Sequence, residues 1–530
     1  MGAPKALQTE GEYREYPGII RWIILLAVML GTLMQVIDTS IVNVAIPQMM
    51  GNLGATLEEI GWVSTGYIIA NVIVLPLTGW LSSRFGRRRY LAISMIIFTI
   101  ASFFCGTSRT LNELIFFRVL QGIGGAALIS TAQATIMEVF PPAQLGMVQA
   151  IFGIGIMVGP TVGPTLGGWI TDNYSWPWIF FINLPIGAIA AFLTFTFVHD
   201  SKHDGADHGK IDLIGIMFLA IGLGCLQTVL EKGNSEGWFE SSLVIWLSIL
   251  SIVGMVTFVW WELRIPYPAV NLRVLKDRGL AAATAFGTVV GIGLFGGIFI
   301  IPVFLQQLRH YTAEQTGWIV VPGALATAVM MPVVGRLVNH FSAKTLSLVG
   351  GIIFIISMFM LRTITLDTGP DQLFWPLVLR GAAMGFLWVP LTLAALAGLK
   401  GKNLADGAAL YNLSRQLGGS AGIAFLTTYV SHKMAFHRAF LVEHVSLYNP
   451  VALQRLHDLT AGLMAKGASL GIARQQALAI MNGTVQSQAA VMAYADAFVV
   501  IGIIFIFALP LLLFFRNTKH NQATAPVAAE

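Results

Sequence analysis

Long apolar segments separated by short polar connections dominate this chain of 530 residues. Each is long enough to cross about 30 Å of hydrocarbon, which takes about 20 helical residues. Because lipid offers no hydrogen-bond partners, a spanning backbone must pair its own amide groups, and we expect every segment to be an α-helix. The fourteen segments are 20–47, 59–81, 89–108, 112–138, 144–171, 177–198, 211–230, 242–261, 279–305, 313–338, 345–364, 373–399, 404–431 and 492–515.

The composition limits what else the chain can be. Only 11% of its residues are charged and 56% are hydrophobic, whereas a soluble domain is about 25% charged. The two cysteines, Cys105 and Cys225, both lie in apolar runs, so we predict no disulfide framework, metal site or cofactor. The sequence has no catalytic triad and no G-x-x-x-x-G-K-[ST] nucleotide loop, which argues against an enzyme and against ATP-driven transport.

The distribution of basic residues predicts the orientation. Lysine and arginine concentrate in connections that share one side when both termini are cytoplasmic, as the positive-inside rule describes. The short outer connections carry far fewer, namely Arg109, Lys232, Arg309 and Arg362, whereas the long outer segment 432–491 departs from the pattern with five basic residues, at a length where the rule reaches its limit. The residues placed inside are Lys5, Arg14, Arg21, Arg84, Arg87, Arg88, Arg89, Lys202, Lys210, Arg264, Arg273, Lys276, Arg278, Lys344, Lys400, Lys402, Arg516 and Lys519.

An internal repeat divides the chain. Residues 56–85 align without a gap over 312–341, and the match includes Pro76 with Pro332 and Gly79 with Gly335. A duplicated half in the same orientation is typical of transporters whose two halves rock about a central site. We therefore predict an all-α membrane protein of two six-helix halves with two inserted helices. The predicted parts are a cytoplasmic tail (1–19), a first half (20–198), the inserted helices (199–262), a second half (263–515) that includes an outer loop (432–491), and a second tail (516–530).

The stretch "GWLSSRFGRRR" (79–89) connects the second and third predicted helices. Gly79 and Gly86 permit close helix approach and a sharp turn, and Arg84, Arg87 and Arg88 can bind helix-end carbonyls or acidic partners. We interpret the stretch as a cytoplasmic gate loop. The alternative is a positively charged anchor with no further role.

Asp38 and Arg118 are charged residues inside predicted helices, and their distances from the helix ends place them at similar depth. An intramembrane carboxylate is costly, so it indicates a functional site. Opposite charges at one depth stabilise each other. We predict proton coupling by this pair, with Asp38 carrying the proton and Arg118 setting its proton affinity; a static buried ion pair is the alternative.

The stretch "GIGIMVGPTVGPTLGG" (153–168) places glycines at every fourth position of a predicted helix. Such a smooth ridge lets two helices pack closely in lipid, and the prolines bend the helix. We expect the ridge to contribute to the seal between the two halves. It consists of Gly155, Gly159, Gly163 and Gly167, and the prolines are Pro160 and Pro164.

Other polar or aromatic residues lie in segments that should face the space between the halves. Arg415 has no acidic residue in its neighbouring sequence, so anion or carbonyl binding and helix-to-helix hydrogen bonding both remain open. The candidates for a substrate cavity are Gln35, Asn43, Gln121, Arg380, Trp388 and Arg415.

Together these stretches resemble the major facilitator superfamily. Residues 79–89 resemble its motif A, with Ser83 where the family most often has Asp, and "LIFFRVLQGIGGA" (114–126) resembles motif B. Residues 153–168 are close to motif C, which marks drug:proton antiporters. "WIFFINLPIG" (178–187) and the fourteen-helix count are similar to the drug-export branch, and nearly the whole chain resembles its EmrB-like members.

The resemblance implies a proton-coupled antiporter that exports hydrophobic or amphipathic toxic compounds across the inner membrane of a bacterial cell, and hence antibiotic resistance. It also implies a periplasmic adaptor of the EmrA type and an outer-membrane channel, with residues 432–491 as the docking loop. The alternative for that loop is a loosely structured segment without a partner. The alternatives for the function are a proton-coupled symporter, an exporter of a single metabolite or siderophore, and a membrane sensor or channel.

Overall fold

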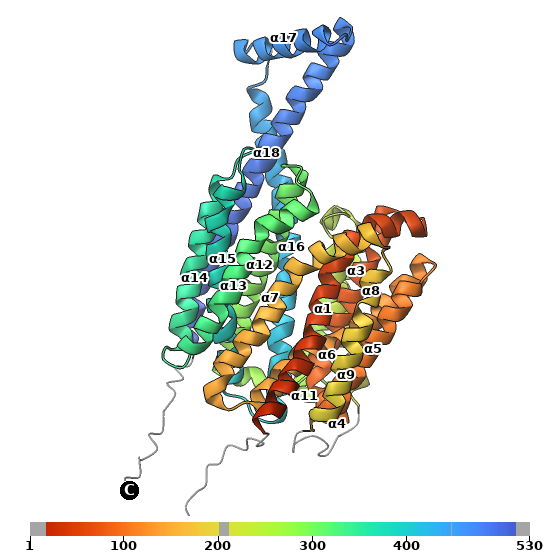
Figure 1. Cartoon of the computed structure of the whole chain (residues 1–530), viewed down its shortest axis with the longest axis vertical. Helices are drawn as coiled ribbons and strands as arrows, with labels where there is room; N and C mark the ends of the chain where they lie inside the picture. Colours follow the sequence, from red (N-terminus) through yellow and green to blue (C-terminus); the bar gives the residue numbers. More distant parts are fainter. Residues whose placement is uncertain (1–16, 201–210, 447, 516–530) are drawn as a thin grey trace, which may run out of the picture.

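The computed structural model describes residues 17–200, 211–446 and 448–515, and over these ranges it is helical with no β-strand (Figure 1). The predicted all-α class is confirmed. Most of the predicted first tail (1–19) and the whole of the second (516–530) lie outside the described residues, as do the basic residues Lys5, Arg14, Lys202, Lys210, Arg516 and Lys519.

The first six predicted spans correspond to an N-terminal group of helices, and two of these spans are broken. Pro76, which has no amide donor, lies in the 3-10 turn η1 that interrupts the second span. The sixth span is divided into α8 and α9. The helices are α1 (Gly18–Leu53), α2 (Leu57–Ile60), α3 (Trp62–Val74), η1 (Leu75–Leu77), α4 (Thr78–Phe85), α5 (Arg87–Thr107), α6 (Leu111–Val139), α7 (Pro142–Asn173), α8 (Trp178–Phe181) and α9 (Asn183–Phe197).

The remaining spans form the inserted pair and a C-terminal group. The inserted pair is α10 (Leu213–Lys232) and α11 (Ser242–Arg264), with the short turns η2 (Trp238–Glu240) and η3 (Leu272–Lys276) beside them. The C-terminal group is α12 (Arg278–Gln307), α13 (Ala313–Leu337), α14 (Ala343–Met360), η4 (Leu361–Thr363), α15 (Pro370–Leu396), α16 (Lys402–Glu443), α17 (Pro450–Ala465), α18 (Leu470–Ala508) and η5 (Leu509–Phe514).

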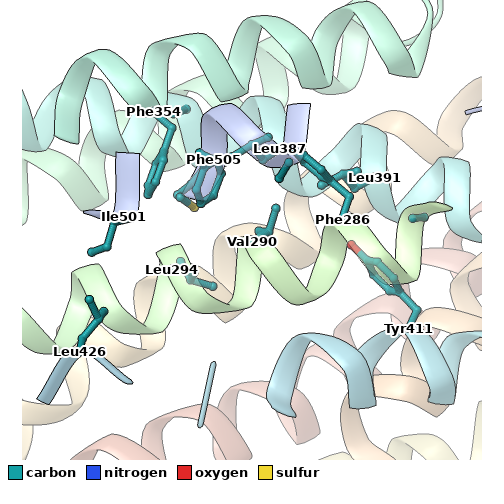
Figure 2. Packing of buried hydrophobic residues seen from close by; sticks show 14 of the residues in the cluster. Phe286, Val290, Leu294, Phe354, Leu387, Leu391, Tyr411, Leu426, Ile501 and Phe505 are labelled. Carbon is teal, nitrogen blue, oxygen red and sulfur yellow. The ribbon is translucent and has the colours of Figure 1, made fainter. Parts of the chain in front are cut away.

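The two groups lie side by side, and α7 packs on α1 in its own group and on α13 in the other (Figure 1). We call the boundary between the groups the seam. We call the end of the molecule where α1 begins the terminal face, and the end that carries α17 the extension face. In the C-terminal group, α12 directs Phe286, Val290 and Leu294 into a core shared with α14, α15 and α18 (Figure 2). Burial of these apolar side chains holds the helices together, and the helices in turn position the polar residues described below.

Among the residues that the structure describes, thirteen helices are long and apolar enough to cross a membrane. The predicted span 404–431 lies within α16, which is not among them, so the count of fourteen is confirmed for thirteen spans. The physical reason lies in its surroundings: α16 packs on α12, α18, α10, α4 and α6. A helix enclosed by protein can carry buried polar residues, and α16 carries Asp406, Asn412 and Arg415.

The predicted outer loop (432–491) is mostly helical. α16 continues through Glu443, α17 lies across the end of the molecule, and α18 begins at Leu470, well before the predicted span (Figure 1). The alternative of a loosely structured loop is therefore wrong. Asn449 caps α17 by accepting hydrogen bonds from the amides of Val451 and Ala452, and Pro450 occupies the first helical position.

The inserted helix α10 lies along one side of the seam. Its Gly224 faces Ile73 and Ile69 of α3, while its Gln227 Nε2 donates to Ser420 Oγ of α16 at 2.9 Å. The same helix thus contacts both groups.

Candidate functional site: a buried ion pair and the seam between the helix groups

Asp38 of α1 and Arg118 of α6 form an ion pair inside the N-terminal group. Arg118 Nη1 donates to Asp38 Oδ2 at 2.6 Å, and the two side chains are 1% and 0% exposed. Arg118 Nε also donates to the carbonyl of Val63 at 3.1 Å. The pair is therefore enclosed by α1, α3 and α6, and neither charge reaches solvent in this conformation.

Amide side chains complete the surroundings of the carboxylate. Gln121 Nε2 donates to Asp38 Oδ1 at 2.8 Å, and Asn183 Nδ2 donates to the same oxygen at 2.9 Å. Both amides also donate to Ser102 Oγ, at 2.7 and 3.3 Å. Since one cation and two amides hold the carboxylate, protonation of Asp38 would weaken each of these hydrogen bonds and leave Arg118 with an uncompensated charge.

Asp38 and Arg118, which the sequence predicts at one depth, are in contact in the structure. Gln121, predicted for the substrate cavity, instead bonds to Asp38 and Ser102. The sequence does not indicate the parts of Ser102, Asn183 and Tyr67; the Tyr67 ring lies 4.3 Å from the Arg118 guanidinium carbon. Asn183 was visible as a polar residue within "WIFFINLPIG", but nothing local indicated which helix it faces.

The residues of the predicted gate loop anchor the terminal face. Gly86 adopts a φ of +83°, which favours glycine, and allows the Arg88 amide to donate to Asp200 Oδ1 at 2.9 Å. Arg87 Nη2 donates to Glu138 Oε1 of α6 at 2.9 Å, and the Arg84 guanidinium lies 5.5 Å from the Trp80 ring centroid. These contacts stay within the N-terminal group.

Gly79 of this loop reaches the other group. A Cβ at Gly79 would lie 2.9 Å from the backbone Cα and N of Asp406, so α4 and α16 touch here without room for a side chain. Ser83 is buried and donates to the carbonyl of Trp80 at 2.9 Å. The contact across the seam thus uses Gly79 and an acidic residue of α16.

The glycine ridge of α7 packs against α1. A Cβ at Gly155 would meet Leu33, one at Gly159 would meet Val36 at 2.6 Å, and one at Gly167 would meet Ile41 at 2.6 Å. Gly163 faces Ser40. Because α1 and α7 belong to the same group, the expectation that this ridge seals the two halves is wrong.

A different face of α7 forms that contact. A Cβ at Gly335 of α13 would lie 2.6 Å from the carbonyl oxygen of Gly146, so the two backbones touch near the terminal face. Gly335 is the repeat partner of Gly79, and both glycines lie at contacts across the seam.

The residues predicted for a substrate cavity do not gather in one place, and Gln121 lies at the ion pair described above. Gln35 is buried, and Asn43 is exposed and accepts from Ser64 Oγ at 3.3 Å. Arg380 donates to the carbonyl of Gly297 at 2.7 Å, within the C-terminal group. Trp388 and Arg415 lie together, with the guanidinium carbon 3.9 Å from the indole ring centroid.

Arg415 belongs to a polar cluster at the seam. Its Nη2 donates to Asn412 Oδ1 at 2.8 Å, and Asn412 Nδ2 donates to Gln133 Oε1 of α6 at 2.6 Å. A Cβ at Gly153 of α7 would lie 2.9 Å from Trp388 Cδ1. The cluster therefore joins α15 and α16 to α6 and α7, one pair of helices from each group.

Comparisons with known proteins agree with this architecture. Residues 28–423 match the Major Facilitator Superfamily. The chain is 35% identical over 494 residues to the multidrug export protein EmrB of Escherichia coli K12, covering 93% of this chain and 94% of that protein. It is 32% identical over 514 residues to the fatty acid resistance protein FarB of Neisseria gonorrhoeae, covering 96% and 99%.

Solved structures show the same fold at lower identity. A double-tryptophan mutant of XylE superposes with a TM-score of 0.61 at 14% identity, covering 95% of this chain and 98% of that one. The human organic anion transporter MFSD10 superposes with a TM-score of 0.59 at 15% identity, covering 94% and 100%.

Proposed function

This chain belongs to the major facilitator superfamily and to its EmrB-like multidrug transporters, and from that premise we propose a proton-coupled antiporter that exports hydrophobic and amphipathic compounds. Its family and fold are those of a multi-pass membrane transporter rather than of an enzyme. The observation that carries the proton coupling is the fully buried Asp38 carboxylate paired with Arg118.

In the proposed cycle, Asp38 takes up a proton from the outer side when the seam is open to that side, and this displaces the exported compound. Protonation removes the negative charge opposite Arg118, so the cation must find new partners or water. That requirement favours movement of α1 relative to α6. Return to the inward-facing state restores the ion pair and releases the proton to the cytoplasm.

The proposed orientation follows from the basic residues. The terminal face carries Arg84, Arg87 and Arg88, and under the positive-inside rule it faces the cytoplasm of a bacterial cell. The extension face then lies on the periplasmic side of the inner membrane.

The test is transport by purified protein in proteoliposomes. With an acidic lumen, inside-out molecules should accumulate ethidium in the vesicle, and a protonophore should abolish the accumulation. Asp38→Asn should insert and bind dye but lose accumulation driven by the pH gradient, whereas Asp38→Glu should retain part of it.

Asp172→Asn is the matched control, because it makes the same change at an exposed position near the end of α7 and should transport normally. Coupled accumulation by Asp38→Asn at the wild-type rate would remove this residue from the mechanism. In cells, faster net entry of dye when the protein is present would support a symporter instead.

We also propose that the helical extension binds a periplasmic adaptor, which connects the transporter to an outer-membrane channel. The extension projects residues 432–443 of α16 beyond the predicted span, or about 18 Å at about 1.5 Å per residue. It exposes apolar side chains at Tyr448, Val451 and Leu470, and exposed apolar surface is typical of an interaction site.

Deletion of residues 444–469, with a short Gly-Ser connection in their place, separates the two proposed roles of the chain, transport and adaptor binding. Transport in proteoliposomes should persist, while tolerance of toxic compounds by cells should fall and crosslinking to the adaptor should disappear. Full tolerance in cells with the deletion would exclude this docking site.

A further inference from the structure

Two buried carboxylates lie together where the inserted helices meet the terminal face. Asp212 immediately precedes α10, Glu262 lies near the end of α11, and the two residues are 5% and 1% exposed. A single Cβ added at Gly215 would touch both Asp212 Oδ2 and Glu262 Oε1, so the two acids border the same small space. Six spans precede α10 in the described part of the chain, and this even number places the start of α10 and the end of α11 at the face where α1 begins.

Each carboxylate has one oxygen bonded and one without a donor. Asp212 Oδ1 accepts hydrogen bonds from the Gly215 amide and from Trp261 Nε1, both at 2.9 Å. Glu262 Oε1 accepts from the Val270 amide at 3.3 Å. Asp212 Oδ2 and Glu262 Oε2 are inaccessible to solvent and have no hydrogen-bond partner among the described residues. Since a buried polar atom without a partner is costly, the pair of acids lacks a donor.

The neighbouring cations do not supply that donor. Arg273 of η3 is close enough to attract the pair, but its Nη2 donates to the carbonyls of Leu263 and Ile265 at 3.1 and 2.9 Å. The Arg264 guanidinium carbon lies 4.1 Å from the Trp260 ring centroid. Neither acid forms an ion pair within the described ranges. Two negative charges this close and this deeply buried repel each other, which favours a proton on one of them.

The other elements that pack on this end of the inserted helices bring no described cation to the pair. The helix α3 carries no charged residue, and in α16 Asp406 lies at Gly79 while Arg415 lies at the seam. Asp277 accepts from the amide of Leu280 and so caps α12. The exposed charges of η3 and the start of α12 are Arg273, Lys276 and Arg278.

A proton fits this space better than a metal ion does. Mg²⁺ and Ca²⁺ take about six or more oxygen ligands, whereas only these two carboxylates meet here among the described residues. A proton on Asp212 Oδ2 needs one acceptor, and Glu262 Oε1 borders the same space. Two interacting carboxyl groups of this kind hold one proton between them and titrate as a unit.

We propose that Asp212 and Glu262 share one proton taken up from the cytoplasmic side, and that this proton fastens the inserted helices to the chain that leads into α12. Asp212 begins α10, while Glu262 holds the Val270 amide in the connection to η3. When the proton leaves, the two charges repel and this junction loosens. The site lies outside the pair of Asp38 and Arg118, so its proton is bound rather than transported. The inference goes beyond the proposed function and rests on it only for the orientation.

The test is equilibrium unfolding of the full chain in detergent, by denaturant titration between about pH 6 and pH 9. The carboxyl groups of the unfolded chain are ionised above about pH 5, whereas the folded pair keeps one proton. The folded state therefore binds the additional proton, and its stability should fall as the pH rises until the pair loses that proton. The contribution to the unfolding constant is a rise of up to about tenfold per pH unit, the linkage for one proton.

Two variants isolate this contribution from that of other groups. Glu262→Gln replaces the protonated acid by an amide of the same shape, so the ratio of the wild-type unfolding constant to that of the variant should rise with pH by the same factor. Asp212→Asn should behave likewise, because asparagine still caps α10. Glu240→Gln makes the matched change at an exposed position at the other end of the inserted pair, and its unfolding constant should follow the pH dependence of the wild type.

Infrared spectroscopy detects the proton directly. The carbonyl-stretch band of a protonated carboxyl group should be present near neutral pH and disappear at alkaline pH. The measurement is made in the Asp38→Asn background, so that Asp38 does not contribute to the band. The part of the band due to the pair should be missing after Glu262→Gln is added to that background.

Each result decides the proposal. Parallel pH dependence of unfolding in the wild type, Glu262→Gln and Asp212→Asn overturns it, since these acids would then have only a structural role. An infrared band that Glu262→Gln leaves unchanged also overturns it. Stabilisation of the wild type, but not of Glu262→Gln, by Mg²⁺ or Ca²⁺ would assign the site to a metal ion instead. Failure of pH-driven ethidium transport in the wild type would contradict the proposed function and leave the unfolding and infrared results intact.

Discussion

Gln416 of α16 donates a hydrogen bond of 3.2 Å to the side-chain oxygen of Asn71 on α3, across the seam between the two helix groups. Asn71 is fixed by its own bond to the carbonyl of Gly122 at 3.3 Å. One helical turn earlier, Tyr67 places its ring against Arg118. A short path of contacts therefore joins the ion pair in one group to the residue beside Arg415 in the other.

This contact should contribute to the rate at which the groups separate and close. In a double-mutant cycle of Asn71→Leu and Gln416→Met, we expect each single change to alter the rate of ethidium transport. The coupling energy should be about 0.5–1.5 kcal/mol, the net contribution of one hydrogen bond. Additive effects in the double variant would show that the bond has no role in the transport step.

The buried ion pair of Asp38 and Arg118 predicts how the free energies of unfolding of its variants should rank. Arg118→Gln leaves Asp38 buried without its cation, which should lower the free energy of unfolding by about 3–5 kcal/mol. The double variant Asp38→Asn with Arg118→Gln has no buried charge at the pair and should be more stable than Arg118→Gln alone. Thermal unfolding in detergent measures both, and a double variant less stable than the single one would contradict the assignment of the pair.

Sequence reasoning was sufficient where depth along a helix decides the contact. Asp38 lies in a helix that runs toward one face and Arg118 in one that runs back, so counting residues from the ends placed both charges at one level. The four-residue spacing of the glycines likewise required one smooth face. Both inferences depend only on the regular period of the α-helix, which can be counted directly along the sequence.

The lateral order of the helices was beyond this reasoning. The residue pattern of α5 and α9 does not indicate that Ser102 and Asn183 face Asp38. The pattern of α7 likewise does not indicate that its glycine ridge faces α1 rather than the other group. The span predicted at 404–431 lies within α16, but its sequence does not indicate that Asn412 and Arg415 are buried against protein rather than lipid. These placements come from the packing of whole groups, not from local pattern.

The packing of α7 on α1 leads to a test of the glycine ridge. At Gly163 an added Cβ would overlap the Ser40 side chain, whereas at Gly168 the nearest atom would be 3.9 Å away on Val44. Gly163→Ala should therefore lower the free energy of unfolding by about 1–3 kcal/mol through overpacking, and Gly168→Ala should change it little. Equal melting temperatures for the two variants would show that α1 moves aside without cost.

The contact between Gly79 and Asp406 predicts a change in conformation rather than in folding. A Cβ at Gly79 would meet the backbone of α16 at 2.9 Å, and backbone atoms cannot turn away as a flexible side chain can. Gly79→Ala should disfavour the arrangement in which α4 and α16 touch by about 1–3 kcal/mol. Since about 1.4 kcal/mol is a tenfold change in population, the ratio of molecules separated at the terminal face to molecules closed there should rise by about 5- to 150-fold.

Spin labels at Phe85→Cys and Lys400→Cys, in a chain whose two native cysteines are replaced, would report this separation as a longer distance. Gly51→Ala is the control, because a Cβ there meets no atom within 4 Å. If Gly79→Ala folds normally and keeps the wild-type distance distribution, α16 yields at Asp406, and the close approach of the two helices does not hold the terminal face closed.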